Sequence, residues 1–321
     1  MAASISQPQG HISPGEALAL AQQAPSILKA NPRAISRSPL VSLFSATETP
    51  ELWTVYENLL LSCLRTGDEK SAHECLERLV ARFGGENEKV LALNGLVKEA
   101  EADNTEALLA ILKEYDDILQ GGVSNTPVAK RKVALLKSMD KVADAITALT
   151  SILDTNPTDS ESWAELSDLY LDQGLYPQAI YALEEALIIF PNAWNMHARL
   201  GEVLLMAATM GDAPQRHLAE SLKRFCRSIE LCDDYLRGYY GLKKVTDQIL
   251  SDGTKIKKPD SEGFSLPEQS TVEKLNEVAT SKLAEIVRRY NASEKLWQGY
   301  NADEVAAARQ LLRETRPDLI R

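Results

Sequence analysis

Residues 160–193 read SESWAELSDLYLDQGLYPQAIYALEEALIIFPNA, and the spacing of residue types in this stretch decides the fold. Gly174 falls where a turn between two helices is expected, because a positive φ is cheap only for glycine. Counted from Ser160, large apolar residues, small residues and a closing proline fall at positions 4, 7, 8, 11, 20, 24, 27 and 32, which are Trp163, Leu166, Ser167, Tyr170, Ala179, Leu183, Ala186 and Pro191. This spacing predicts two amphipathic helices whose small residues permit close approach, the second ended by Pro191.

The pattern is that of the tetratricopeptide repeat, and the neighbouring segments carry it in weaker form. Residues 126–159 match it at Leu136, Ala145, Leu149 and Pro157 and depart from it at Ala129 and Lys132. Residues 53–83 read as a further helix pair turning at 66–68, and Gly95 and Ala107 keep the separation of the two small positions. After Pro191 the pattern restarts with His197, Leu200, Gly201 and Leu204, and beyond an insertion at 211–217 it continues with Ser221, Phe225 and Ser228.

These segments predict an all-α, tetratricopeptide-like α-solenoid of about five or six helix pairs with C-terminal capping helices. We expect a flexible N-terminus over residues 1–15 and the superhelix over 16–250. Residues 251–270 are rich in Gly, Pro, Ser and charge, so we expect an exposed loop or linker there. Residues 271–321 contain two amphipathic segments, 271–290 and 302–315, which we expect to shield the last repeat from water.

The composition argues against several classes of function. The chain of 321 residues is 44% hydrophobic, which is enough to build a core, and its net charge of −11 opposes binding to nucleic acid or to an anionic membrane surface. No apolar run approaches the about 20 residues of a membrane span, and the first residues lack the features of a secretory signal, so we expect a cytosolic protein. The cysteines lack metal-ligand spacing and are expected to be reduced core residues: Cys63, Cys75, Cys226 and Cys232.

Residues suited to catalysis are scattered along the chain. The four histidines show neither triad nor metal-ligand spacing, and no glycine loop suited to phosphate is present. We therefore predict no enzyme activity, no metal and no cofactor. Trp163, Tyr170 and Tyr176 are consistent either with a ligand-stacking set or with core packing, and their helical register favours the core.

In repeats of this type the first helix of each pair lines a concave groove, and repeat positions 2, 5, 9 and 12 point into it. The candidate groove has a basic end at Lys130, Arg131 and Lys137, an acidic centre at Glu161, Asp168 and Glu202, and further groove positions at Leu171, Asn195 and Leu205. Such charges suit partner segments of opposite charge, although solvating charges on a helix surface look the same in a sequence. A cochaperone adaptor that grips a C-terminal carboxylate is the alternative function. It would need asparagine at groove positions that here hold Ala134, Asp168 and Glu202.

Several stretches together resemble the family of subunit 2 of the endoplasmic reticulum (ER) membrane protein complex. They are WTVYENLLLSCLRTGDEKSAHECLERLVARF (53–83), AKRKVALLKS (129–138), ESWAELSDLYLDQGLYPQAIYALEEALIIFP (161–191), SLKRFCRSIELCDDYLRGYYGL (221–242) and SKLAEIVRRY (281–290). The likeness covers nearly everything from residue 50 onward, in the same order. The chain departs from the family at Gly84, where a proline is usual, and in a longer turn at 120–127, and both departures fall in loops.

The resemblance implies a peripheral scaffold on the cytoplasmic face of the ER membrane that touches the membrane only through its partners. The complex it points to inserts transmembrane segments, including those of tail-anchored proteins. Its implied partners are the cytosolic parts of subunits 3 and 5 and, where present, a soluble subunit 8 or 9. The implied role is to organise the membrane subunits, with no chemistry of its own.

Overall fold

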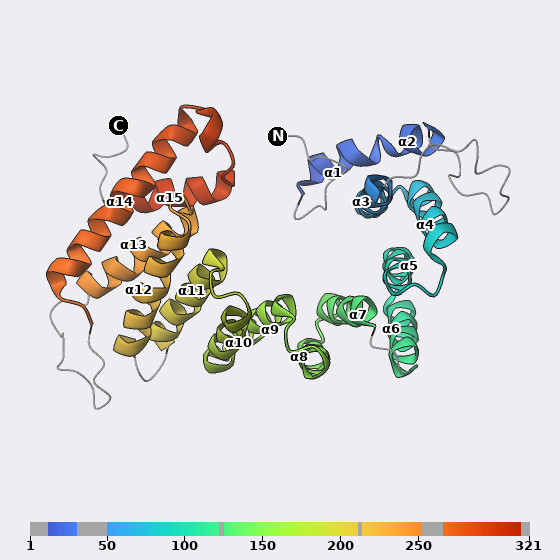
Figure 1. The fold of residues 1–321 in the computed structure, drawn as a ribbon, viewed down its shortest axis with the longest axis horizontal. Helices are drawn as coiled ribbons and strands as arrows, with labels where there is room; N and C mark the ends of the chain where they lie inside the picture. The colour runs from blue at the N-terminus through green and yellow to red at the C-terminus, as the bar shows by residue number, and fades with distance from the viewer. Residues whose placement is uncertain (1–11, 31–49, 122–124, 211–213, 252–265, 316–321) are drawn as a thin grey trace. The chain divides into compact units, whose positions relative to one another are not determined.

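The computed structural model describes residues 12–30, 50–121, 125–210, 214–251 and 266–315, and its secondary structure there is helical (Figure 1). The chain divides into two compact units, residues 1–148 and residues 149–321. This confirms the predicted all-α fold. The predicted flexible N-terminus and linker fall largely outside the described residues, and the predicted domain boundaries stay predictions.

The first unit consists of short helices followed by consecutive helix pairs. In chain order these are α1 (Pro14–Ala21), α2 (Ala24–Ala30), α3 (Pro50–Thr66), α4 (Glu69–Phe83), α5 (Glu88–Glu101), α6 (Thr105–Gln120) and α7 (Thr126–Ser138). Helix α1 packs against α3 and α2 against α4, and each of α3, α4, α5 and α6 contacts the next helix along the chain. One hydrophobic core lies among α1 to α5, and another lies among α5, α6 and α7. Helix α8 (Val142–Thr155) crosses the boundary between the units.

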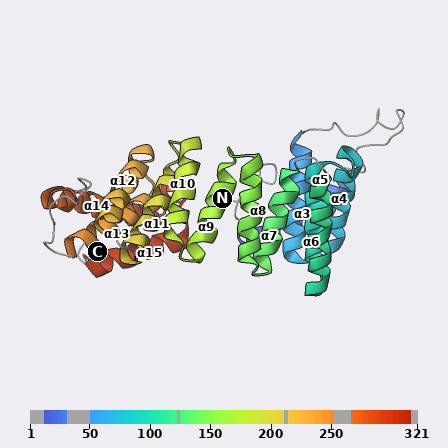
Figure 2. The same ribbon diagram turned by 90° about the horizontal axis from the view of Figure 1, so that it is seen from below.

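The second unit continues the same plan. Its helices are α9 (Ser160–Asp172), α10 (Tyr176–Ile189), α11 (Trp194–Met210), α12 (Pro214–Leu231), α13 (Leu236–Ser251), α14 (Gln269–Asn291), a short 3-10 turn at Lys295–Trp297, and α15 (Ala302–Thr315). Each helix from α9 to α14 contacts the next, and α15 contacts both α13 and α14. Seen from below, α11 to α14 lie alongside one another (Figure 2). The predicted terminal segments 271–290 and 302–315 are therefore helical and cover the end of this unit.

The turns after α9, α3 and α7 share one hydrogen-bonding pattern. Gly174 has a φ of +70°, as predicted, and its N–H donates to the Leu171 carbonyl while the next N–H, of Leu175, donates to the Tyr170 carbonyl. The same two bonds recur after α3, where Gly67 has a φ of +74°. They recur again after α7, where Asp140 takes a φ of +58°. Left-handed closure of a helix end satisfies carbonyls that would otherwise lack partners, and aspartate tolerates this conformation better than most residues.

The repeat register is confirmed by contacts between its small residues. The hydroxyl of Ser167 on α9 donates to the carbonyl of Ala179 on α10 at 2.9 Å, and both residues are fully buried. In the next pair the hydroxyl of Ser221 on α12 donates to the carbonyl of Gly201 on α11 at 2.7 Å. The small positions are again in contact, but here the serine lies on the second helix of the pair. Leu166, Leu183 and Ala186 are buried as predicted, whereas Trp163 and Tyr170 are only partly buried, and Pro191 follows the end of α10.

Phe225 of α12 occupies the centre of the second unit's larger core. Its ring is fully buried and passes between two helix backbones that carry glycine at the point of contact, Gly201 on α11 and Gly241 on α13. A Cβ built on Gly201 would lie 3.0 Å from the ring, and one built on Gly241 would lie 2.0 Å from it. The two glycines are therefore required by the ring they enclose, and they fix the spacing of three consecutive helices.

Candidate partner-binding face

Successive first helices are joined by ion pairs across their exposed sides. We call the surface that carries these pairs in each unit the first-helix face. In the second unit it carries Asp168 on α9, Arg199 and Glu202 on α11, and Arg237 on α13. The Arg199 guanidinium donates to the Asp168 carboxylate at 2.7 and 3.2 Å and to the Glu202 carboxylate at 3.0 Å. Arg237 reaches Glu202 at 3.2 Å, so one ladder of alternating charge spans three helices.

The ion pairs of the ladder favour the charged form of Arg199. Burial alone lowers the pKa of the Arg199 guanidinium, but hydrogen bonds to Asp168 and then Glu202 outweigh this and raise the pKa above its ordinary value. Asp168 remains exposed and Glu202 partly exposed, so both carboxylates keep contact with water. The predicted acidic centre is thus brought together at Asp168 and Glu202, but Arg199 and Arg237 balance its charge.

The first unit carries the same kind of bridge. Lys89 on α5 pairs with Glu57 on α3 at 2.7 Å. Arg131 on α7 donates to both oxygens of Glu99 on α5, at 2.8 and 2.6 Å, in the bidentate geometry that makes arginine–carboxylate pairs strong. The phenol of Tyr115 on α6 donates to the same Glu99 carboxylate. Burial, followed by this hydrogen bond to the anionic partner, raises the pKa of Tyr115 well above its ordinary range.

The other predicted groove residues divide between contact and exposure. Lys130 and Arg131 are partly buried at the middle of α7, while Lys137 is exposed near its end. Glu161 and Asn195 are exposed at the starts of α9 and α11. Leu171 and Leu205 are partly buried, and each packs against one of the hydrophobic cores described in the second unit. Whether the nine predicted groove residues, Asp168 and Glu202 among them, bind a partner stays a prediction.

The pairing partners of the predicted residues were not identified from the sequence. Arg199 lies at repeat position 6, outside the positions that point into a groove, so the repeat register alone does not select it, and the sequence did not single out Glu99 or Arg237. A signal was nevertheless present, because the paired residues lie 32, 32, 31 and 35 residues apart, close to one repeat length. Opposite charges separated by one repeat fall on equivalent places of neighbouring first helices, and this spacing identifies such bridges.

No grouping of three or more His, Cys, Asp or Glu side chains suited to a metal ion occurs within the described ranges. None of the helices that the structure describes combines the length and the hydropathy needed to cross a bilayer.

Paired helices in a shared register, several of them closed by the same left-handed turn and joined through small residues, define a tetratricopeptide-repeat protein. Residues 78–220 match the family model described as the EMC2 TPR-like repeat domain. The chain is 31% identical to ER membrane protein complex subunit 2-B of Xenopus laevis over 211 residues, which are 65% of this chain and 68% of that protein. It is 33% identical to the TPR repeat protein oca3 of Schizosaccharomyces pombe over 219 residues, 66% of this chain and 75% of that protein.

A third relative is ER membrane protein complex subunit 2 of Saccharomyces cerevisiae, 30% identical over 184 residues, which are 52% of this chain and 61% of that protein. The range matched by the family model includes the stretch with the strongest repeat, residues 160–193. The chain belongs to the family of ER membrane protein complex subunit 2.

Proposed function

We propose that this chain is a scaffold subunit of the ER membrane protein complex, held at the cytoplasmic face of the ER membrane by its partners. The observation that carries the proposal is the family relationship, since the similarity extends over two thirds of a relative that is itself named as subunit 2 of that complex. The repeat fold adds a physical reason, because stacked helix pairs expose a long surface for other polypeptides.

The proposed role is to organise the membrane subunits that insert transmembrane segments, including those of tail-anchored proteins. The partners are the cytosolic parts of subunits 3 and 5 and a soluble subunit 8 or 9 where one exists. The chain carries out no reaction and needs no cofactor in this role. It supports insertion by fixing the cytosolic parts of its partners in one arrangement.

We further propose that partners dock on the first-helix faces. In the second unit, Asp168, Arg199, Glu202 and Arg237 form an ordered row of charged donors and acceptors beside the partly buried Leu171 and Leu205. A row of fixed charges next to apolar side chains suits a polypeptide segment, because charges set its register while apolar contacts supply affinity. In the first unit Lys130 and Lys137 add basic side chains on α7, where Arg131 is paired with Glu99.

Fractionation of cells that express the tagged full-length chain tests the scaffold role. We expect the chain to sediment with membranes, to be released by detergent, and to copurify with membrane subunits of the complex. A chain found in the soluble fraction with chaperone C-termini bound would instead establish the cochaperone adaptor, and the scaffold proposal would be wrong.

The docking face is tested by a double charge reversal, Asp168→Lys with Glu202→Lys. Both are at least partly exposed, and surface ion pairs contribute only about 0–1 kcal/mol, so the fold should survive. Like charges across an interface cost several kcal/mol, so recovery of membrane subunits should fall by about tenfold or more. Glu184→Lys is the matched control. Glu184 on α10 pairs with Arg224 on α12, so this substitution also breaks an ion pair, but one that joins second helices and lies outside the first-helix face. Equal recovery with the double variant and the control would show that partners use another face.

A further inference from the structure

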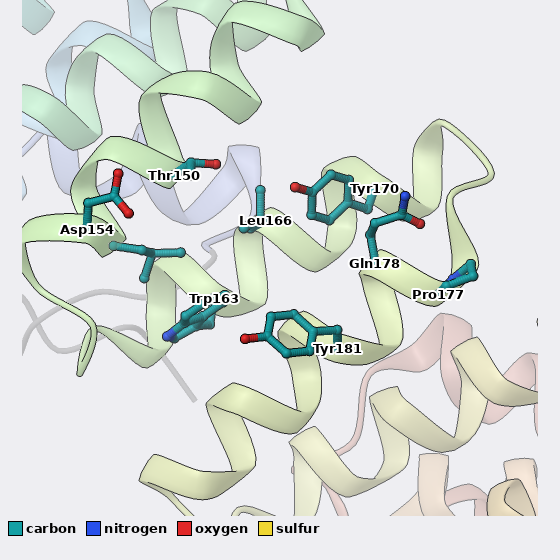
Figure 3. Close-up of a pocket in the computed structure, with 9 residues that line it drawn as sticks. Thr150, Asp154, Trp163, Leu166, Tyr170, Pro177, Gln178 and Tyr181 are labelled. Atoms are coloured by element: carbon teal, nitrogen blue, oxygen red, sulfur yellow. The ribbon is translucent and has the colours of Figure 1, made fainter.

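A pocket of about 430 Å³ lies in the second unit, away from the ion-pair ladder. Its sides come from the C-terminal part of α8 and from α10, which are second helices, and its floor comes from α9 (Figure 3). The volume falls within the range of about 300–1,000 Å³ that is usual for ligand sites. Of the aromatic set that the sequence singled out, Trp163 and Tyr170 line this pocket, and both Tyr170 and Tyr176 pack against the neighbouring core.

Aromatic rings form much of the pocket wall. The rings of Trp163 and Tyr181 meet edge to face, with centroids 6.0 Å apart, and Tyr170 lies further along the pocket (Figure 3). The Trp163 indole N–H donates to the Pro157 carbonyl at 2.9 Å, so the polar edge of this ring already has a partner. Tyr181 is 56% exposed, so its ring is open to a ligand. The walls therefore present ring surfaces, which attract cations.

Acidic residues outnumber basic ones around the pocket, although Asp168 on α9 is paired with Arg199 and Glu184 on α10 with Arg224. Between Lys141 and Arg199 the sequence contains no lysine or arginine and nine aspartates and glutamates. One of these, Asp154, lines the pocket across from Trp163, and it is exposed and lacks a cationic partner among the described residues. Glu185 lies close enough to the Tyr181 phenol that its negative charge raises the pKa of Tyr181. An anionic ligand would be repelled here, and a cation would be attracted by both the carboxylates and the rings.

We propose that this pocket binds an arginine side chain from an extended segment of a partner protein. The guanidinium would stack on the rings of Trp163 and Tyr181 and pair with the Asp154 carboxylate. Arginine fits better than lysine, because its planar, weakly hydrated guanidinium both stacks on aromatic rings and pairs with a carboxylate. Apolar residues beside the arginine would contact Leu153 and Leu166, which also line the pocket. The site lies apart from the first-helix face, so the proposal stands whether or not partners dock on that face.

The full-length chain labelled with 5-fluorotryptophan tests the proposal by ¹⁹F NMR. The chain has four tryptophans, and the Trp163→Phe variant identifies the resonance of Trp163. The probe is the capped peptide acetyl-Gly-Leu-Arg-Leu-Gly-amide, and its control carries citrulline, a neutral isostere, in place of arginine. We expect the arginine peptide to shift the Trp163 resonance saturably while the other three stay in place, and the citrulline peptide to bind about tenfold or more weakly.

Two variants with the same change of charge separate a direct ion pair between the arginine and Asp154 from the overall negative charge of the surrounding helices. Asp154→Asn should weaken binding of the arginine peptide by about tenfold, because it removes the carboxylate from the pocket. Asp172→Asn, at an exposed position of α9 that does not line the pocket, should leave binding nearly unchanged. The proposal is overturned if the Trp163 resonance does not shift, if the citrulline peptide binds equally well, or if Asp172→Asn weakens binding as much as Asp154→Asn.

Discussion

Replacing Gly241 by alanine should destabilise the second unit, although alanine is the better helix former. Gly241 is buried in α13, and a Cβ there would lie 2.0 and 2.2 Å from two atoms of the Phe225 ring. Ordinary contacts begin near 3.4 Å, so the ring or the helix has to move by more than 1 Å. The ring has little room to move, because the Gly201 backbone lies close on its other side and Phe225 is fully buried.

Two opposing effects set the magnitude. Glycine to alanine inside a helix gains about 1 kcal/mol from backbone entropy. Overpacking a closed core costs about 1–3 kcal/mol, occasionally more. A side-chain shift of a few tenths of an ångström would not relieve the contact at Gly241, because the added Cβ lies 2.0 Å from the Phe225 ring. We therefore expect a net loss of about 2 kcal/mol in the free energy of unfolding, or about 4–8 °C in the melting temperature of a unit of this size.

Thermal unfolding followed by circular dichroism measures the loss, and hydrogen exchange read by mass spectrometry locates it in α11 to α13. Gly15→Ala in α1 is the control, because nothing lies within 4 Å of its added Cβ. Gly201→Ala should fall between the two, since its Cβ would lie 3.0 Å from the ring. In a Phe225→Leu background Gly241→Ala should become neutral or stabilising. An equal loss with and without the Phe225 ring would refute the argument, because the ring is its stated cause.

Two further predictions follow from the same structure. Ala179→Leu overfills the contact where Ser167 bonds to the Ala179 carbonyl, so it should cost about 1–3 kcal/mol in urea unfolding and weaken assembly through folding, whereas wild-type unfolding would refute the register. Burial raises the pKa of the Cys63 thiol to about 11 and that of Cys75 to about 12, from an ordinary 9.0. Below pH 9 these thiols are protonated in both states, and above it the unfolded chain alone releases protons. The free energy of unfolding should therefore fall between about pH 9 and pH 12, and Cys63→Ser/Cys75→Ser should flatten that fall in urea titrations.

The strong repeat made much of the fold predictable from the sequence. Residues 160–191 set the register, and that register located the pairs before and after it, because the small positions recur at a fixed separation. The turn conformation of Gly174 was predictable because only glycine adopts it cheaply. Asp140, which takes the same conformation, carried no such signal, since aspartate occurs in many other settings.

The candidate sites were harder to predict because they depend on how neighbouring helices align. The sequence identified Asp168 and Glu202 as groove residues but not Arg199, which joins them, because that requires knowing which residues of adjacent first helices lie side by side. It likewise identified Trp163 and Tyr170 but favoured a core role for them. Their partial exposure depends on the distance between α8 and α10, and no repeat position specifies that distance.

The ion-pair ladder and the pocket present a partner with two different kinds of surface. On the first-helix face, Asp168 and Glu202 are matched by Arg199 and Arg237, so a partner meets local dipoles of fixed direction and little net charge. Such a surface selects the register of a segment more than the sign of its charge. At the pocket, the Asp154 carboxylate has no lysine or arginine nearby in sequence, so it attracts a cationic side chain. A scaffold that carries both can capture a basic tail on one side while it aligns a mixed-charge segment on the other, and the two contacts can be disrupted independently.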